Sequence, residues 1–214
     1  DWKTQTSRDL FFLFLAHPEG LNKEEVGELM WGELSPAELK LRFKNAVYRM
    51  RHAIGSEAVL FIDNYYQFNR SIDYEYDVQN FLSISDQARE EKNNDKRLGL
   101  LKQAADIYQG SYLPEIGELW VEPDRQRYHG MHIANVIALT RLLIERGDLD
   151  EGLSYVQKAL KLDSYNEELH RLAMEIYALT GNKPAVAKQY QLLSKSLRDQ
   201  IDAVMEDIGV DAVK

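Results

Sequence analysis

The hydrophobic and polar positions of the first 75 residues predict three helices followed by a β-hairpin. In each helical segment, apolar residues recur every three or four positions and so share one face. The second and third segments begin at Asn22 and Ser35, each followed three positions later by Glu, which is a capping signal. Two short runs of β-branched and aromatic residues then flank Asp63 and Asn64, a turn signal. The expected elements are helices over residues 4–17, 22–31 and 35–54 and strands over residues 59–62 and 65–68.

From residue 77 onward the helical periodicity continues with almost no strand signal. Gly147-Asp148 recurs as Gly181-Asn182, a spacing of 34 residues that is the tetratricopeptide period. Helix pairs with this spacing stack into a curved solenoid that binds proteins or peptides, and plain helical packing with no groove in use is the alternative. The expected helices cover residues 77–92, 95–109, 120–146, 150–162, 166–180 and 183–205.

These patterns predict a mainly α-helical fold with two domains. Three helices and a hairpin, with a long amphipathic third helix, are typical of a winged helix-turn-helix domain. The domain that follows is expected to be all-helical and tetratricopeptide-like. The change of pattern at Asp77 places the boundary between residues 1–75 and residues 76–214.

Charge changes the interpretation of the third helix. The chain has a net charge of −9, which argues against non-specific polyanion binding by the molecule as a whole. Residues 39–56 nevertheless carry several Lys and Arg residues and no Asp or Glu. A major groove admits one α-helix, and Arg supplies paired donors for guanine edges or phosphates. The segment therefore predicts binding to double-stranded DNA, and a solvated face of a small α+β domain is the alternative.

The apolar spacing of the third helix selects the candidate contact residues. Phe43, Val47, Met50 and Ile54 are spaced to bury one stripe, which turns the basic and polar positions away from the core. The hairpin is expected to reach a neighbouring minor groove or the phosphate backbone. The candidate DNA-binding residues are Lys44, Asn45, Tyr48, Arg49, Arg51 and His52 on the helix and Asn64 at the hairpin tip.

The composition and the apolar runs of the sequence exclude cysteine-based sites and argue against a membrane-spanning or secreted protein. The chain contains no Cys, which excludes disulfides, thiolate metal sites and thiol nucleophiles and makes a reducing cytoplasm the expected location. The longest apolar run, from Leu10 to Ala16, is far shorter than the roughly 20 residues that span a membrane. No basic leader precedes an apolar stretch, so neither secretion nor a membrane partner is expected.

No catalytic residue, metal site or cofactor is expected. The sequence contains no phosphate-binding loop, nucleophile elbow or zinc-protease motif. His129 and His132 lie three positions apart near Asp124, but a third metal ligand is not evident, so core-edge or solvated His side chains are favoured. Adjacent acidic residues do not face each other on a helix and make poor acid–base pairs. The chain is therefore not expected to be an enzyme.

The order of short motifs resembles a known family of regulators. Three early segments resemble the DNA-binding domain of the Streptomyces antibiotic regulatory protein type. They are Trp2-Lys-Thr, the Leu-Ala-His-Pro-Glu-Gly that ends at Gly20, and residues 43–55. That domain is itself similar to the winged helices of OmpR/PhoB response regulators. The later segments resemble the bacterial transcriptional activation domain that follows it. These later segments are residues 77–81, 105–113, 142–148 and 163–170.

The resemblance implies a sequence-specific DNA-binding transcriptional regulator, either an activator or a response-regulator output module. Its implied partners are double-stranded DNA, RNA polymerase and a second copy of the chain. Arg49 and Arg51 match the basic positions of the family's recognition helix, whereas Tyr48 and His52 depart from its usual residues. The family's domain usually begins with several strands before the position of Trp2, so either a longer regulator or a trimmed domain is expected.

One alternative function is a tetratricopeptide-like interaction module whose winged helix binds a protein partner instead of DNA. The acidity of the whole chain favours this alternative, and the basic segment of the third helix favours DNA. Salt-dependent binding to duplex DNA separates the two, because phosphate contacts release counterions.

Overall fold

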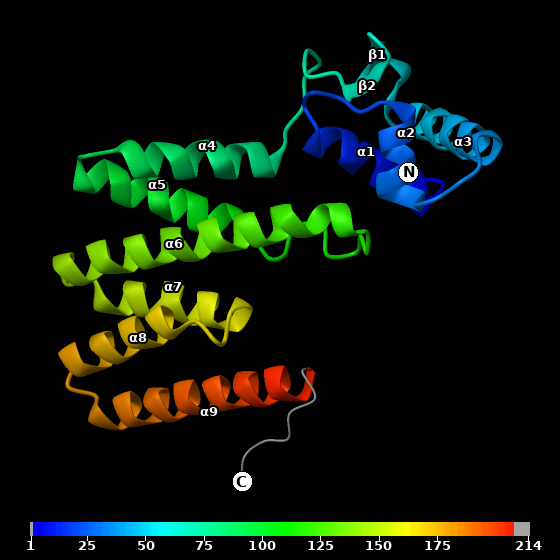
Figure 1. Cartoon of the computed structure of the whole chain (residues 1–214). Coiled ribbons are helices and arrows are strands. Elements are labelled where there is room, and N and C mark those ends of the chain that lie inside the picture. Colours follow the sequence, from blue (N-terminus) through cyan, green and yellow to red (C-terminus); the bar gives the residue numbers. More distant parts are fainter. Residues whose placement is uncertain (1, 208–214) are drawn as a thin grey trace. The chain divides into compact units, whose positions relative to one another are not determined.

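The computed structural model of the chain describes residues 2–207, and Figure 1 shows the order of its helices and strands. These residues divide into two compact units. Unit 1 comprises the chain up to Glu75 together with Tyr112–Arg125, and unit 2 comprises Tyr76–Ser111 together with the chain from Gln126. Residue 1 and residues 208–214, where the expected domains begin and end, lie outside the described residues.

Unit 1 contains three helices and an antiparallel hairpin, and its helix starts are capped as the sequence predicts. The Asn22 and Ser35 side chains accept the backbone N–H three residues on, and the Glu25 and Glu38 carboxylates accept the N–H of the capping residue in return. The elements are α1 (Gln5–Ala16), α2 (Lys23–Trp31), α3 (Pro36–Ile54), a 3₁₀ turn (Ser56–Ala58), β1 (Val59–Ile62) and β2 (Tyr65–Phe68).

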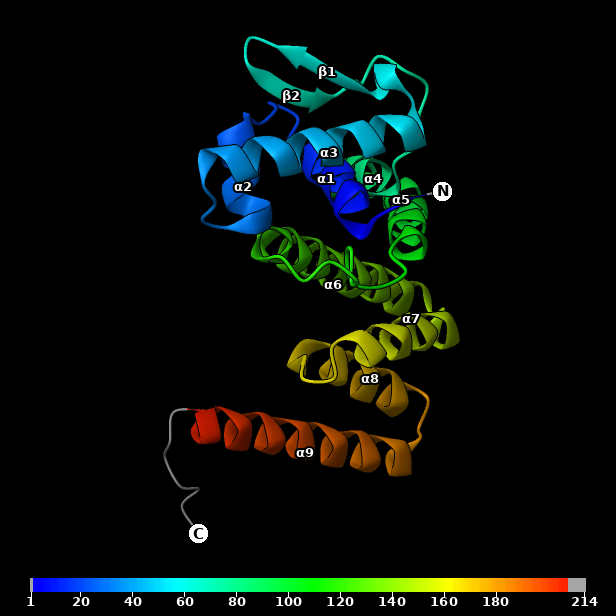
Figure 2. The same ribbon diagram turned by 90° about the vertical axis from the view of Figure 1, so that its right-hand side faces the viewer.

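The core of unit 1 lies between the helices and the hairpin, which runs alongside α3 (Figure 2). The ring of Tyr66 on β2 has its centroid 4.7 Å from that of Phe43 on α3. Leu21, between α1 and α2, pairs with the same residue, donating to the Tyr66 carbonyl at 2.9 Å and accepting its N–H at 2.8 Å. The hairpin is thereby fixed to the helical layer. The main buried residues are Leu10, Leu13, Phe14, Val26, Phe43, Val47, Met50, Val59 and Phe68.

Residues 112–125 belong to unit 1 although they follow the start of unit 2 along the chain. Arg8 of α1 forms an ion pair with Glu115 at 2.6 Å. The Arg125 guanidinium donates to three backbone carbonyl oxygens of this loop, those of Tyr112, Leu113 and Ile116. The sequence pattern alone places the loop in the helical domain, because a segment without periodicity carries no signal of what it packs against.

Within the described residues, unit 2 is built from helices joined by short connections, except between α5 and α6, where the chain passes through the loop of unit 1. Neighbours along the chain pack together, α4 with α5, α7 with α8, and α8 with α9 (Figure 1). Their shared core is apolar and includes Leu101, Leu139, Leu143, Val156 and Leu172. The helices are α4 (Asp77–Glu90), α5 (Asn94–Ile107), α6 (Glu122–Arg146), α7 (Leu149–Leu162), α8 (Glu167–Leu179) and α9 (Lys183–Asp207).

The 34-residue repeat corresponds to two helix ends with the same hydrogen bonds. Gly147 and Gly181 have φ angles of 83° and 73°, in the left-handed region that glycine adopts without strain. After each glycine, the next N–H reaches back to the carbonyl five residues earlier, from Asp148 at 2.9 Å and from Asn182 at 2.8 Å. Both ends are therefore Schellman caps, and each leads into the next helix within a few residues. The predicted mainly helical fold is confirmed, with element ends shifted by a few residues.

Candidate nucleic-acid interface

Helix α3 is the longest helix of unit 1, and it separates a buried stripe from an exposed face. It begins at a capping box with Pro36 in the first turn and ends at Gly55, whose φ of 101° lies in the left-handed region. The expected stripe is buried at Phe43, Val47 and Met50, together with Ala46, whereas Ile54 at the end of the helix is only half-buried. Burial of this stripe fixes which way the remaining side chains of the helix point.

Five of the six helix residues selected from the sequence lie on the exposed face. Tyr48 keeps 69% of its surface accessible, and its ring stacks on His52 with centroids 6.3 Å apart, one helical turn away. Within residues 2–207, neither Lys44 nor Arg49 takes part in an ion pair. The exposed residues are Lys44, Asn45, Tyr48, Arg49 and His52. This face therefore offers cations, an amide and two stacked rings to a ligand.

Arg51 is placed differently from the other candidates. Its side chain is half-buried, and Nη2 donates to the backbone carbonyl of Val59 on β1 at 3.0 Å. Its Nε is buried without a hydrogen-bond partner among the described residues. The periodicity of α3 turns residue 51 away from the core stripe, but the chain returns beside it as the hairpin. Arg51 thus fastens the end of α3 to the hairpin.

Beside the exposed face is a depression of about 270 Å³ that α3 shares with the start of α1 and the end of α2. The side chains on its α3 wall include two guanidinium groups and an amide. From α1 come Thr4 and Thr6, and the Thr4 hydroxyl caps the helix by accepting the N–H of Ser7 and donating to its Oγ atom at 3.0 Å. The lining residues are Thr4, Thr6, Trp31, Arg42, Asn45, Ala46 and Arg49. Donors of this kind suit the oxygens of a phosphate.

The depression adds residues that the sequence did not select. Arg42 lies in the basic segment, and its spacing from Asn45 and Arg49 places all three on one side of the helix, so helical periodicity was a usable signal. Thr4 and Thr6 gave no such signal, because only the packing of α1 against α3 brings them to this wall.

The hairpin tip is a tight turn made by the residues predicted from the sequence. Asp63 and Asn64 have φ angles of 48° and 72°, the pattern of a type I′ turn. Asn64 is exposed there, and three large side chains next to the turn are also exposed. These are Phe61, Ile62 and Tyr65, whereas Tyr66 faces the core. The tip therefore presents both a polar amide and an apolar surface.

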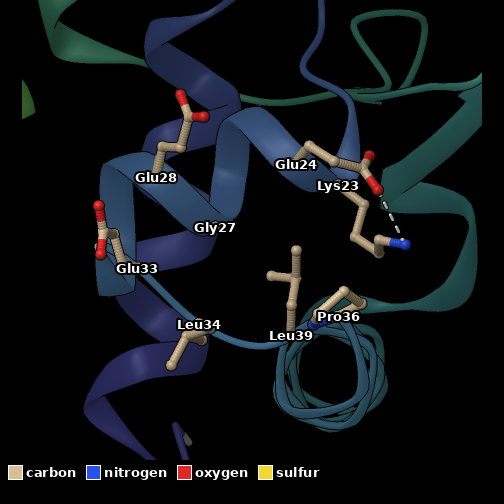
Figure 3. A pocket seen from close by; sticks show the side chains of 9 residues that line it. Lys23, Glu24, Gly27, Glu28, Glu33, Leu34, Pro36 and Leu39 are labelled. Carbon is tan, nitrogen blue, oxygen red and sulfur yellow. Dashed lines mark ion pairs between the residues drawn. The ribbon is translucent and has the colours of Figure 1, made fainter.

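A second hollow of about 680 Å³ lies between α2 and α3 and has the opposite charge (Figure 3). Leu39 points from α3 toward Gly27, where an added Cβ would come within 2.6 Å of its Cδ1 atom. The rim carries Glu24, Glu28 and Glu33, and its Lys23 is paired with Glu24 at 3.0 Å. Three carboxylates make this hollow unsuitable for a phosphate.

The two histidines considered as metal ligands, His129 and His132, contact other side chains of unit 2. His132 is buried and stacks on Tyr108 with ring centroids 4.2 Å apart. Burial, with a smaller contribution from His129, lowers the pKa of His132 to about 4. His129 lies 3.5 Å from Asp163. Within residues 2–207, no cluster of three His, Asp or Glu side chains that could hold a metal ion is found.

Comparison with known protein families identifies the second half of the chain. The family model described as "Bacterial transcriptional activator domain" matches residues 76–207. The chain belongs to this family. Its members are non-catalytic domains of transcription factors, so a role in transcription regulation follows for this chain.

The structure is also similar to that of Mycobacterium tuberculosis EmbR in complex with a low affinity phosphopeptide, with a TM-score of 0.73 and 14% sequence identity. The match covers 93% of this chain and 55% of the EmbR chain, so the chain spans about half the length of that protein. At this identity, the likeness concerns the fold alone. No curated protein matches the sequence. No helix within residues 2–207 is long and apolar enough to cross a membrane.

Proposed function

We propose that this protein is a sequence-specific DNA-binding transcriptional regulator whose residues 1–75 form a winged-helix domain and whose remaining residues form the activation domain. The observation that carries the proposal is the exposed face of α3, where Lys44 and Arg49 have no ion-pair partner within residues 2–207. A helix of this kind fits a major groove. The match to a transcriptional activator domain supports the same role.

The residues of α3 divide into base contacts and backbone contacts. Arg49 and Asn45 carry the side chains that read guanine and adenine edges through paired hydrogen bonds. Lys44, and Arg42 in the depression beside α1, are assigned to phosphates. The stacked pair of Tyr48 and His52 covers the neighbouring sugar or base surface.

Two further residues act at the edges of this surface. Arg51 holds the hairpin through Val59 and is assigned a positioning role, since its guanidinium is engaged within unit 1. Asn64 at the turn contacts the minor groove or the phosphate backbone. Because the turn is a single residue pair at the end of two short strands, its contribution to affinity is small.

The partners of the activation domain are RNA polymerase and a second copy of the chain. The support is the family itself, which is named for transcriptional activation, and the stacked helix pairs of unit 2. Either an activator or a response-regulator output module is consistent with this arrangement.

The decisive experiment selects bound duplexes from a random library and measures affinity for the selected site over a range of salt concentrations. We expect a steep fall of affinity with salt, and a slope that decreases by about 1 in Lys44→Ala, because one phosphate contact is lost. Lys161→Ala, an exposed lysine of α7, is the matched control and should keep the wild-type slope. Equal slopes for all three proteins would reject the interface.

One observation favours a second function, the binding of a protein partner by unit 1. The hollow between α2 and α3 has leucine side chains inside a rim of glutamates, which suits a basic and apolar peptide (Figure 3). Under this alternative, Glu28→Gln and Glu33→Gln weaken binding to the captured partner, and Lys44→Ala has no effect on any ligand. The duplex selection would then return no enriched sequence.

A further inference from the structure

Residues 112–125 form a strap that follows α5 of unit 2, belongs to unit 1 and leads back into unit 2 through α6. The end of the strap, Glu122–Arg125, is the first turn of α6, and the same helix continues into unit 2 from Gln126. The whole strap lies inside the region that matches the transcriptional activator domain. A segment of the activation domain is therefore a structural part of the unit that carries α3.

Arg125 holds the strap in shape and ties it to α6. Its Nε atom donates to the Tyr112 carbonyl at 2.8 Å, and its Nη2 atom donates to the carbonyls of Leu113 and Ile116. Only 19% of the Arg125 side chain is accessible. One planar guanidinium thus supplies the donors for three carbonyls. Because Arg125 lies in the first turn of α6, the position of that helix fixes the position of the loop that it holds.

The strap is fastened to α1 by an ion pair and to unit 1 by buried apolar side chains. Arg8 of α1 bridges Glu115 of the strap, at 2.6 Å, and the buried carboxylate of Asp9, at 3.2 Å. Ile116 is 2% accessible and Val121 is fully buried. Docking of the strap therefore removes apolar surface from water and engages the Arg8 guanidinium.

Helix α1 connects this attachment to the DNA-binding face. The Arg8 N–H donates to the carbonyl of Thr4 one turn earlier, and Thr4 lines the depression that also contains Arg42 and Arg49 of α3. Helices α1 and α3 also pack against each other. A strap that holds Arg8 therefore holds the first turn of α1, which lines the depression.

The docked strap also has unfavourable features. Leu113 has a φ of 45°, in the left-handed region that is strained for a residue with a side chain. Within the described residues, Glu118 Oε2 and Trp120 Nε1 are buried without a hydrogen-bond partner. Each of these atoms has lost its hydration without a replacement. Release of the strap would relieve these costs, so docking balances gains against losses, as an element with two positions requires.

We propose that the strap is a conformational switch: docking on α1 sets unit 1 for DNA binding, and release lowers the affinity for DNA. Both ends of the strap continue into helices of unit 2, so an event that moves α6 reaches the depression through Arg125 and Arg8. Arg125 is a positioning residue, since it is not among the proposed DNA contacts. The inference rests on the proposed function of α3, and hydrogen exchange of the strap separates the two.

Hydrogen exchange and duplex affinity of the full chain test the switch. Arg125→Met removes the donors to three carbonyls, so residues 112–121 should exchange faster and affinity for the selected duplex should fall by about tenfold. Amides of α3 and of the hairpin should keep their wild-type protection. Arg141→Met is the matched control, because Arg141 lies on the same helix but pairs with Glu168 of unit 2, and it should change neither measurement.

A cross-link that holds the strap on α1 should remove the effect of Arg125→Met. The protein has no Cys, so Arg8→Cys combined with Glu115→Cys supplies the two thiols for a short bis-maleimide at positions that face each other. After cross-linking, chains with Met or Arg at position 125 should bind the duplex equally. Without the reagent, the chain with Met should keep its loss of affinity. A loss that persists after cross-linking contradicts control by docking.

Linkage supplies the reverse test, because docking that raises DNA affinity must itself be favoured by DNA to the same extent. A saturating duplex should slow exchange of residues 113–121, although none of them is a proposed contact. Unchanged exchange, or unchanged affinity in Arg125→Met, overturns the switch and leaves DNA binding by α3 intact. Loss of protection throughout α3 in Arg125→Met also overturns it, since the residue would then support folding. A wild-type chain that binds no duplex rejects both the proposed function and the switch.

Discussion

Several arginines of unit 2 pair with carboxylates, whereas Arg49 on the exposed face of α3 in unit 1 does not. Arg171 pairs with Glu168 at 2.5 Å, and Arg146 pairs with Asp95 at 2.5 Å. Arg49 on α3 has no ion-pair partner within residues 2–207. An arginine side chain is thus paired at these positions of unit 2 and available for a ligand on α3.

Local sequence explains why Arg171 is paired and Arg49 is not, whereas Arg146 meets Asp95 only because packing brings α5 and α6 together. On a helix, a side chain meets those three and four positions away, so an arginine is neutralised when an acid occupies one of these positions. Arg171 has Glu168 three positions before it, whereas the corresponding neighbours of Arg49 are Asn45, Ala46, His52 and Ala53. The net charge of −9 therefore says little about either surface. The placement of acids along each helix decides where cations remain free to bind.

Mild acid should destabilise unit 2 more than unit 1, and this is the largest effect we expect. The pKa of His132 in unit 2 is about 4 in the folded state, below the ordinary value of 6.5. As pH falls through this interval, only the unfolded state takes up the proton, so unit 2 loses up to roughly 3 kcal/mol of stability. Burial raises the pKa of Asp9 in unit 1. Hydrogen bonds from Lys23 and Ser35 lower the pKa of Glu24 and of Glu38 in the same unit, which acts in the opposite direction. These are carboxyl groups with ordinary pKa values of 4.5 or below, so unit 1 should change less than unit 2 as pH falls from 6.5 to 4.

Hydrogen exchange of amides in α6 and α3 as a function of pH measures the two responses separately. His132→Phe keeps the ring beside Tyr108 and should remove most of the pH dependence in α6, and His129→Gln should leave it. Equal loss of protection in both helices as pH falls from 6.5 to 4 would contradict the assignment of the effect to His132.

The contrast between paired and unpaired arginines should appear directly in DNA affinity. Arg49→Ala should lower affinity for a selected duplex by about 1–3 kcal/mol, since it removes a base contact, and should leave thermal unfolding unchanged. Arg171→Ala removes an equal charge from unit 2 and should leave DNA affinity at the wild-type value. Fluorescence anisotropy with a labelled duplex measures both. Similar losses for the two variants would show that net charge alone drives binding.

Arg51 should behave as a structural residue within the basic helix. Arg51→Met keeps the aliphatic part of the side chain but removes the hydrogen bond to Val59, so we expect a loss of about 1–3 kcal/mol in the stability of unit 1. Calorimetry of Arg51→Met beside Arg49→Ala tests this division. Unchanged unfolding of Arg51→Met would place its guanidinium among the DNA contacts instead.

The hairpin tip should have the smallest effect. Asn64→Gly preserves the left-handed backbone of the turn, so the hairpin should fold normally and DNA affinity should fall by less than in Arg49→Ala. Asn64→Ala adds backbone strain at the same position. If Asn64→Gly weakened binding as much as Arg49→Ala, the hairpin would be a principal contact.

The sequence was sufficient for most of the fold and part of the site. Capping residues and apolar periodicity are local signals, so they predicted α2, α3 and the hairpin within a few residues. The same periodicity predicted the exposure of Lys44, Tyr48 and Arg49. It failed at Arg51, because the neighbour that half-buries this side chain is a strand that comes after the end of the helix.

By itself, the sequence determined the helices, the turn at Asp63 and Asn64, the 34-residue repeat and the basic face of α3, since each depends on residues close along the chain. Only the tertiary structure decided that residues 112–125 pack with unit 1, that Thr4 and Arg42 share one depression, and that the side chain of Arg51 meets β1. These features depend on which surfaces meet. Helical periodicity shows that a face is apolar, but the partner that covers it is set by packing between segments far apart in the sequence.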